Sequence, residues 1–171
     1  ATVTVPSGGA ASIDFAGIPS GYKHLQVRVL ARGARTPVTY DNFIIRFNSD
    51  TGNSYSYHAI YGDARAGGPF TDNSTSASFI SAGNIPGAAS LANSFGVAVI
   101  EILDYADISK NKTMRSLNGY DSNTTGYNNT FSTIALNSGA WYNTAAITSI
   151  TFIPSNSPFQ EFSSFALYGV K

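Results

Sequence analysis

Apolar and polar residues alternate along most of this chain with the two-residue period of a β-strand. Leu25, Val27 and Val29 fall in one phase, which predicts a buried strand face. His24 and Arg32 fall in the opposite phase, which we expect to face outward. Other runs of this kind cover residues 2–5, 12–15, 42–48, 54–61, 76–81, 94–104, 112–118, 130–137, 147–153 and 165–170.

Short polar turns, rather than helices, separate these runs. Clusters of Pro, Gly, Ser and Asn interrupt the pattern at residues 6–9, 18–21 and 67–69. No segment keeps a helical period for more than about two turns. About ten strands without crossover helices predict an all-β protein, an antiparallel β-sandwich of jelly-roll type, formed as one domain from residues 1–171.

One run departs from simple alternation. Residues 95–103 are apolar in both phases towards the end of the run. Such a pattern is typical of a strand in the centre of a sheet, or of a strand that carries a bulge.

Composition narrows the range of partners. Lys and Arg number 10, Asp and Glu number 10, and charged residues make up 12% of the chain, about half of the usual quarter. The chain therefore lacks the broad positive charge with which proteins bind nucleic acid or anionic membranes. It also has no cysteine, which excludes disulfides, thiolate metal sites and cysteine nucleophiles.

Candidate catalytic groups are few. His24 and His58 are the only histidines, and the chain has neither a metal-binding histidine spacing nor a Gly-x-Ser-x-Gly motif. Glu101, Asp104 and Asp107 lie close in sequence, but Glu101 and Asp104 would point to opposite faces of a strand. We therefore expect at least one of them in the following turn, and not a glycosidase pair. The sequence predicts a protein that is not an enzyme and has no cofactor.

The segment 48–53 is rich in oxygen ligands. It lacks the spacing and the terminal glutamate of an EF-hand loop. We expect a turn in which Asp50 and Asn53 bond their own backbone. A calcium ion held partly by backbone carbonyls is the alternative.

Aromatic side chains are the remaining candidates for binding. Tyr55, Tyr57 and Tyr61 share one strand face, which favours core packing or cross-strand pairs. Others are expected in loops, where tyrosine and tryptophan can stack on sugars or proteins and asparagine can hydrogen-bond them. The predicted ligand- or host-binding residues are Tyr120, Tyr127, Trp141, Tyr142, Asn123, Asn128 and Asn143.

Four segments of the chain have a further pattern in common with known proteins, and they are residues 18–27 (Ile-Pro-Ser-Gly-Tyr-Lys-His-Leu-Gln-Val), 45–55, 141–152 and 165–171. Together they resemble the virion proteins of tailed bacteriophages, a group of tail, head-decoration and fibre proteins. The resemblance spans nearly the whole chain and rests on strand-and-turn patterns, not on a catalytic signature. At residues 163–164 this chain has Ser-Ser where the group commonly enters the last strand through Gly-Ser.

The resemblance implies a β-sandwich on the exterior of a phage particle. Its expected partners are other virion proteins, either the major capsid protein or fibre and tail subunits, and further copies of itself, with a trimer favoured. Decoration or cementing of the capsid is the first interpretation. The alternatives are a receptor-binding fibre tip that recognises a host surface glycan, and a carbohydrate-binding module of a secreted enzyme. A neutral surface rich in Ser, Thr and Asn suits protein subunits and neutral sugars alike.

Overall fold

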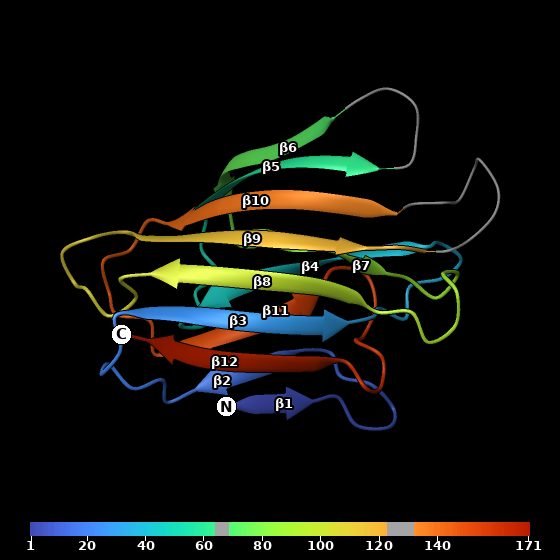
Figure 1. Ribbon diagram of the computed structural model, residues 1–171. Coiled ribbons are helices and arrows are strands. Elements are labelled where there is room, and N and C mark those ends of the chain that lie inside the picture. Colours follow the sequence, from blue (N-terminus) through green and yellow to red (C-terminus); the bar gives the residue numbers. More distant parts are fainter. Residues whose placement is uncertain (64–68, 123–131) are drawn as a thin grey trace.

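The computed structural model describes residues 1–63, 69–122 and 132–171, and these form two antiparallel β-sheets packed face to face (Figure 1). The smaller sheet has the strand order β2 (Ile13–Ala16), β11 (Ser149–Pro154), β4 (Tyr40–Phe47) and β7 (Ile80–Pro86). The larger sheet has the order β1 (Thr2–Thr4), β12 (Ser164–Val170), β3 (His24–Ala31), β8 (Gly96–Leu103), β9 (Lys112–Tyr120), β10 (Thr133–Trp141), β5 (Tyr55–Asp63) and β6 (Phe70–Ala77).

The chain passes between the sheets in the manner of a jelly roll. Strands β2, β4, β7 and β11 lie in the smaller sheet, while β3, the pair β5–β6, and β8–β10 lie between them in sequence and belong to the larger sheet. The antiparallel meander β8–β9–β10 takes the place that a single strand holds in the simplest form of this fold. The predicted all-β, jelly-roll-like sandwich is therefore confirmed, with twelve strands in the described residues instead of about ten.

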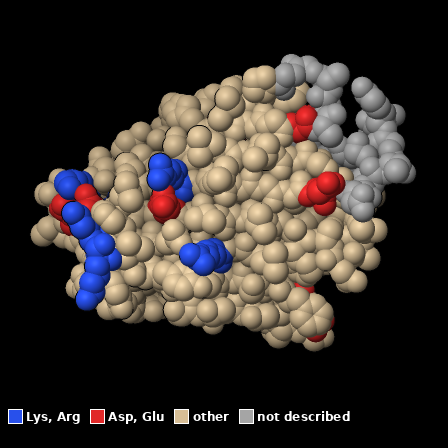
Figure 2. Space-filling model, in the orientation of Figure 1, with Lys and Arg blue, Asp and Glu red and all other residues tan. Residues whose placement is uncertain are grey.

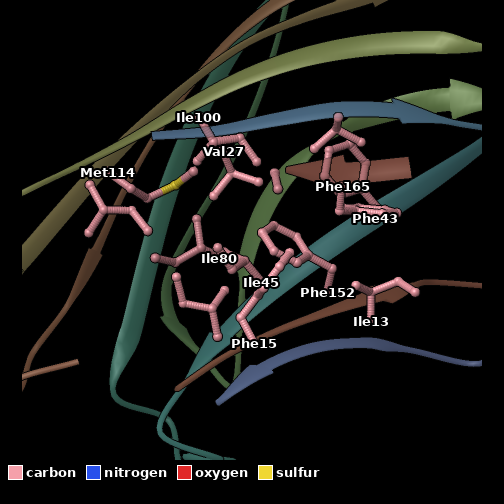
Figure 3. Close-up of a cluster of buried hydrophobic side chains, with 14 of the residues drawn as sticks. Ile13, Phe15, Val27, Phe43, Ile45, Ile80, Ile100, Met114, Phe152 and Phe165 are labelled. Atoms are coloured by element: carbon pink, nitrogen blue, oxygen red, sulfur yellow. The ribbon is translucent and has the colours of Figure 1, made fainter. Parts of the chain in front are cut away.

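The core lies between the two sheets and contains the residues that the alternation pattern assigns to it. Leu25, Val27 and Val29 of β3 are buried, as are Phe43 and Ile45 of β4. Aromatic rings bridge the layers, with the ring centroids of Phe152 and Phe165 5.2 Å apart (Figure 3). When the opposing sheet covers one face of a strand, the alternation of apolar and polar residues along that strand is enough to specify which side chains enter the core.

Two strands differ from the sequence prediction. The run at residues 76–81 is not one strand, because β6 ends at Ala77 and β7 begins at Ile80. β6 escapes detection since it is an edge strand of mostly exposed polar residues, Phe-Thr-Asp-Asn-Ser-Thr-Ser-Ala. Such a strand buries little apolar surface, and its sequence then carries no hydrophobic period.

Arg32 also differs from the prediction. Its phase in the sequence predicts an outward side chain, but the residue is only 4% exposed. It follows the end of β3, where the chain leaves the sheet and the period of two no longer applies. Its guanidinium turns to the segment 88–94 and donates hydrogen bonds to backbone carbonyls there.

A pair of buried asparagines covers the open edge of β7. Asn118 Oδ1 accepts from the Asn84 backbone N–H at 3.2 Å, and Asn137 Nδ2 donates to the Ser81 carbonyl at 3.3 Å. The two asparagine side chains also bond each other at 2.8 Å. These amides on the inner face of the larger sheet thus satisfy backbone groups that the last strand of the smaller sheet leaves without a β partner.

Gly83 gives the Asn118 side chain the space for this arrangement. Its φ is +143°, and a Cβ at this position would lie 2.4 Å from Asn118 Cγ. We therefore expect Gly83→Ala to lower the free energy of unfolding by about 2–3 kcal/mol. Urea unfolding followed by the fluorescence of Trp141, the single tryptophan, measures this change.

The matched control for this prediction is Gly62→Ala. Gly62 also lies in a strand, β5 of the larger sheet, but a Cβ there meets nothing within 4 Å. Its substitution should leave the midpoint of unfolding unchanged or raise it slightly, because alanine restricts the unfolded chain. Equal losses of stability in both variants would contradict the steric role of Gly83.

Candidate interaction surfaces

The outer face of the larger sheet carries a row of exposed aliphatic side chains. Cross-strand pairing places Val99, Leu117, Leu136 and Ile60 side by side on β8, β9, β10 and β5. Their neighbours on the same face extend the row along the strands. We call the whole set the outer apolar strip, and it consists of Leu30, Ile60, Val97, Val99, Leu117, Ile134 and Leu136.

Residues of the outer apolar strip are between 42% and 66% exposed. These fractions correspond to roughly 600 Å² of aliphatic surface, at the upper end of the largest patch on a typical monomer. Figure 2 looks onto this face and shows a broad uncharged area with few charged side chains. A patch of this size on a soluble β-sheet marks an interaction surface more often than a chance exposure.

Charged groups border the strip along β8, β9 and β3. Arg115 Nε donates to Glu101 Oε2 at 2.6 Å, and the two residues are direct cross-strand partners. Arg28 lies over the ring of Tyr168, with its Cζ 5.1 Å from the ring centroid. The strip therefore has the arrangement of a protein interface, with an apolar centre and a polar rim.

One sequence feature pointed to the outer apolar strip: some runs have apolar residues at both the inward and the outward positions of the strand. Residues 95–103 are apolar on both faces, and β8 indeed lies in the interior of the larger sheet. Ala98 and Ile100 face the core, while Val97 and Val99 face outward. Periodicity alone cannot distinguish a strand covered on both faces from one with an exposed apolar face.

Trp141 does not lie in a loop, and the expectation that it does is wrong. It ends β10 and is 1% exposed, with its ring stacked on Tyr55 at a centroid distance of 6.2 Å. Its indole Nε1 donates to Asp50 Oδ2 at 2.7 Å. The ring belongs to the core and has no face free for a sugar.

Tyr120 is buried as well, at the far end of the same hairpin. In the β9–β10 pairing Trp141 is opposite Lys112, eight residues before Tyr120, so Tyr120 and Trp141 are about 26 Å apart along the strand. Tyr142 and Asn143 follow Trp141 directly and are exposed. The structure thus separates Tyr120 from the other three, while Tyr127, Asn123 and Asn128 lie outside the described residues.

The turn around Asp50 has the local hydrogen bond predicted for Asp50, but the Asn53 side chain makes none to the described residues. Asp50 Oδ1 accepts from the Gly52 backbone N–H at 2.8 Å, and Oδ2 accepts from Ser54 Oγ at 2.6 Å. The Ser54 hydroxyl and the Trp141 indole hold the pKa of the Asp50 carboxyl below its usual value. Both carboxylate oxygens are thus occupied by protein donors. The described residues contain no group of three or more His, Asp or Glu arranged to hold a metal ion.

The carboxylates near the end of β8 are engaged in ion pairs and turn bonds. Asp104 lies in the turn after β8, as predicted, and accepts from Lys110 Nζ at 2.8 Å. Hydrogen bonds from Ser109 and Lys110 lower the pKa of Asp107 to about 2. A general acid needs a raised pKa, whereas their hydrogen bonds lower the pKa of Asp104 and of Asp107.

No protein-family model matches this chain, and no curated protein matches it. A legume lectin-like domain from Entamoeba histolytica is 10% identical, with a TM-score of 0.16, and the match covers 99% of this chain and 84% of that one. A candidate pore-forming toxin from Bacteroides vulgatus is 8% identical, with a TM-score of 0.11, and the match covers 91% and 55% of the two chains. Likenesses at this level carry no argument about function.

The described part of the chain contains no helix that is long and apolar enough to span a membrane.

Proposed function

We propose that this chain is a structural protein of a phage virion, which decorates the particle by docking its outer apolar strip on neighbouring protein subunits. The strip is the observation that carries the proposal. A rigid, pre-formed β-surface loses little conformational entropy on binding, so more of the gain from apolar burial is retained as affinity. Charged residues are depleted at the centre of protein interfaces, and the strip contains none.

The resemblance to tailed-phage virion proteins supports the choice of partner. It concerns strand-and-turn segments throughout the chain, among them residues 24–27 at the start of β3. The low charge of the whole chain agrees with a protein that contacts other subunits over much of its surface. A homo-oligomer docked on the shell would combine several weak copies of this contact into one strong attachment.

The double variant Leu117→Lys/Leu136→Lys tests the strip directly. These residues are cross-strand neighbours near its centre, and two lysines there would have to be desolvated on docking. We expect the folded variant to bind particles that lack the protein at least about 100-fold more weakly than the native chain. Co-sedimentation with such particles measures this affinity.

The control for this variant is Ile108→Lys. Ile108 is the most exposed of the large hydrophobic residues in the described chain and lies in a turn away from the strip. Its substitution should leave particle binding unchanged. Native-like binding by the strip double variant would contradict the proposal.

Cementing adds a second expectation. Particles assembled without this protein should form normally but rupture at a lower temperature or a milder osmotic shock than complete particles. Light scattering during heating, together with release of DNA, measures the threshold. If particles with and without the protein rupture at the same threshold, the protein does not cement the capsid, even if it attaches to it.

A further inference from the structure

A second surface, a polar groove, lies on the opposite side of the larger sheet from the outer apolar strip. The larger sheet is wider than the smaller one, and β5 and β6 extend past β7, the last strand of the smaller sheet (Figure 1). The groove at this step has a volume of about 390 Å³ and is formed by residues of β4, β5, β6, β7 and β10. Its principal side chains are Tyr40, Asn42, Tyr61, Asp72, Asn84 and Asn137.

The chemistry of this lining excludes several ligand classes. None of the described lining residues is Lys, Arg or His, so the lining itself offers no cation to a phosphate or a carboxylate. Asp72 is the single acid among them, and the described residues contain no group of three or more acidic or histidine side chains that could hold a metal ion. Amides and hydroxyls outnumber apolar groups, which is unfavourable for a lipid or another apolar ligand.

Several lining groups have unused hydrogen-bonding capacity. The side chains of Asn42, Asp72 and Asn84 make no hydrogen bond to any described residue. Together they offer amide donors and acceptors and one carboxylate acceptor. A ligand with many neutral hydroxyl groups satisfies such a set.

The rest of the lining is held in place. The Tyr61 ring is stacked on Phe70 with a centroid distance of 5.5 Å, and the Arg35 guanidinium lies 4.7 Å from the centroid of Tyr40. Asn137 is fixed by its bonds to Asn118 and Ser81. Pre-organised side chains reduce the entropy that binding costs.

Tyr120 lies beside this groove. It is opposite Thr133 in the β9–β10 pairing, two residues from Ala135 of the lining. Burial raises the pKa of its hydroxyl, and Tyr40 and Asp63 raise it further. Its Oη is buried and has no hydrogen-bond partner among the described residues. An unsatisfied buried hydroxyl of this kind is unusual in a native protein.

We infer that this groove is a binding site for a neutral saccharide. A saccharide carries many neutral hydroxyls, which suit the amides of Asn42 and Asn84 and the carboxylate of Asp72. The volume is enough for about two hexose units. Because the groove and the outer apolar strip lie on opposite faces of one sheet, a chain docked through the strip keeps the groove open to solvent. The inference itself does not depend on docking, because the isolated chain presents the groove.

The test measures binding of the isolated chain to neutral di- and trisaccharides of glucose, galactose, mannose and N-acetylglucosamine. Saturation-transfer NMR identifies a ligand and calorimetry gives its affinity. We expect at least one saccharide to bind with a Kd below about 10 mM. Asn84→Ala and Asp72→Asn should each weaken that binding about tenfold or more without changing the thermal unfolding midpoint, since both remove only unpaired polar groups.

Three variants serve as controls. Tyr142→Ala and Asn143→Ala change exposed groups at the end of β10, away from the groove, and should bind the saccharide normally. Leu117→Lys/Leu136→Lys should also bind normally, so loss of docking and loss of saccharide binding are separate results. Absence of binding to every saccharide, or binding that the two groove variants leave unchanged, would overturn the inference.

Discussion

Replacing Trp141 with alanine should lower the free energy of unfolding by about 4 kcal/mol. The indole packs against Phe47 at a centroid distance of 5.8 Å as well as against Tyr55. Its removal leaves a cavity between the sheets and deprives Asp50 Oδ2 of the donor at 2.7 Å. A cavity and a lost hydrogen bond act in the same direction, so their costs accumulate.

Urea unfolding followed by circular dichroism measures this loss, because the variant has no tryptophan left for fluorescence. The matched control is Tyr142→Ala at the next position. Tyr142 is 55% exposed and its side chain makes one hydrogen bond, with Ser56, so the loss of this side chain should cost less than about 1 kcal/mol. A Trp141→Ala variant as stable as the control would contradict the core role of the indole.

The second large effect concerns Arg32. Its guanidinium donates to the carbonyls of Leu91 at 2.7 Å, Ser90 at 2.9 Å, Ser94 at 2.9 Å and Ala88 at 3.2 Å. One planar group thus organises the segment between β7 and β8 through backbone atoms. Arg32→Met should lower the free energy of unfolding by about 3–5 kcal/mol, because several carbonyls lose their charged donor at once.

Arg28→Met is the control for this prediction. Arg28 belongs to the same part of the chain, but it is exposed and contacts the Tyr168 ring and Gln26, so its substitution should cost less than about 1 kcal/mol. Hydrogen exchange provides a second measurement. Amides of residues 88–94 should lose protection in Arg32→Met and retain it in Arg28→Met, and unchanged protection in both would contradict the role of Arg32.

The interior of the sandwich was predictable because its strands each have one covered face. Leu25, Val27 and Val29 are buried as their spacing predicts. The prediction failed for residues at or just beyond the end of a strand, and for a charged side chain that is buried because it donates hydrogen bonds to backbone carbonyls. Arg32 lies just beyond β3, and Trp141 lies at a strand end that the sequence presents as a loop.

The two candidate surfaces were harder to predict from the sequence than the core. The outer apolar strip joins residues of β3, β5, β8, β9 and β10, which come together only through strand pairing. The groove depends on β6, whose polar sequence carries no hydrophobic period, and on the point at which the smaller sheet ends. Both surfaces are products of strand order, which periodicity does not contain.

The sequence by itself determined that this protein is all-β, that its strands have two distinct faces, and which side chains fill most of the core. Those properties follow from local steric preferences and the period of two along each strand. The tertiary structure alone decided that Val99 and Leu117 face solvent and that Asn118 and Asn137 face inward to cover β7. A strand has the same two faces wherever it lies, and only the neighbouring strands and the opposing sheet decide which face is covered.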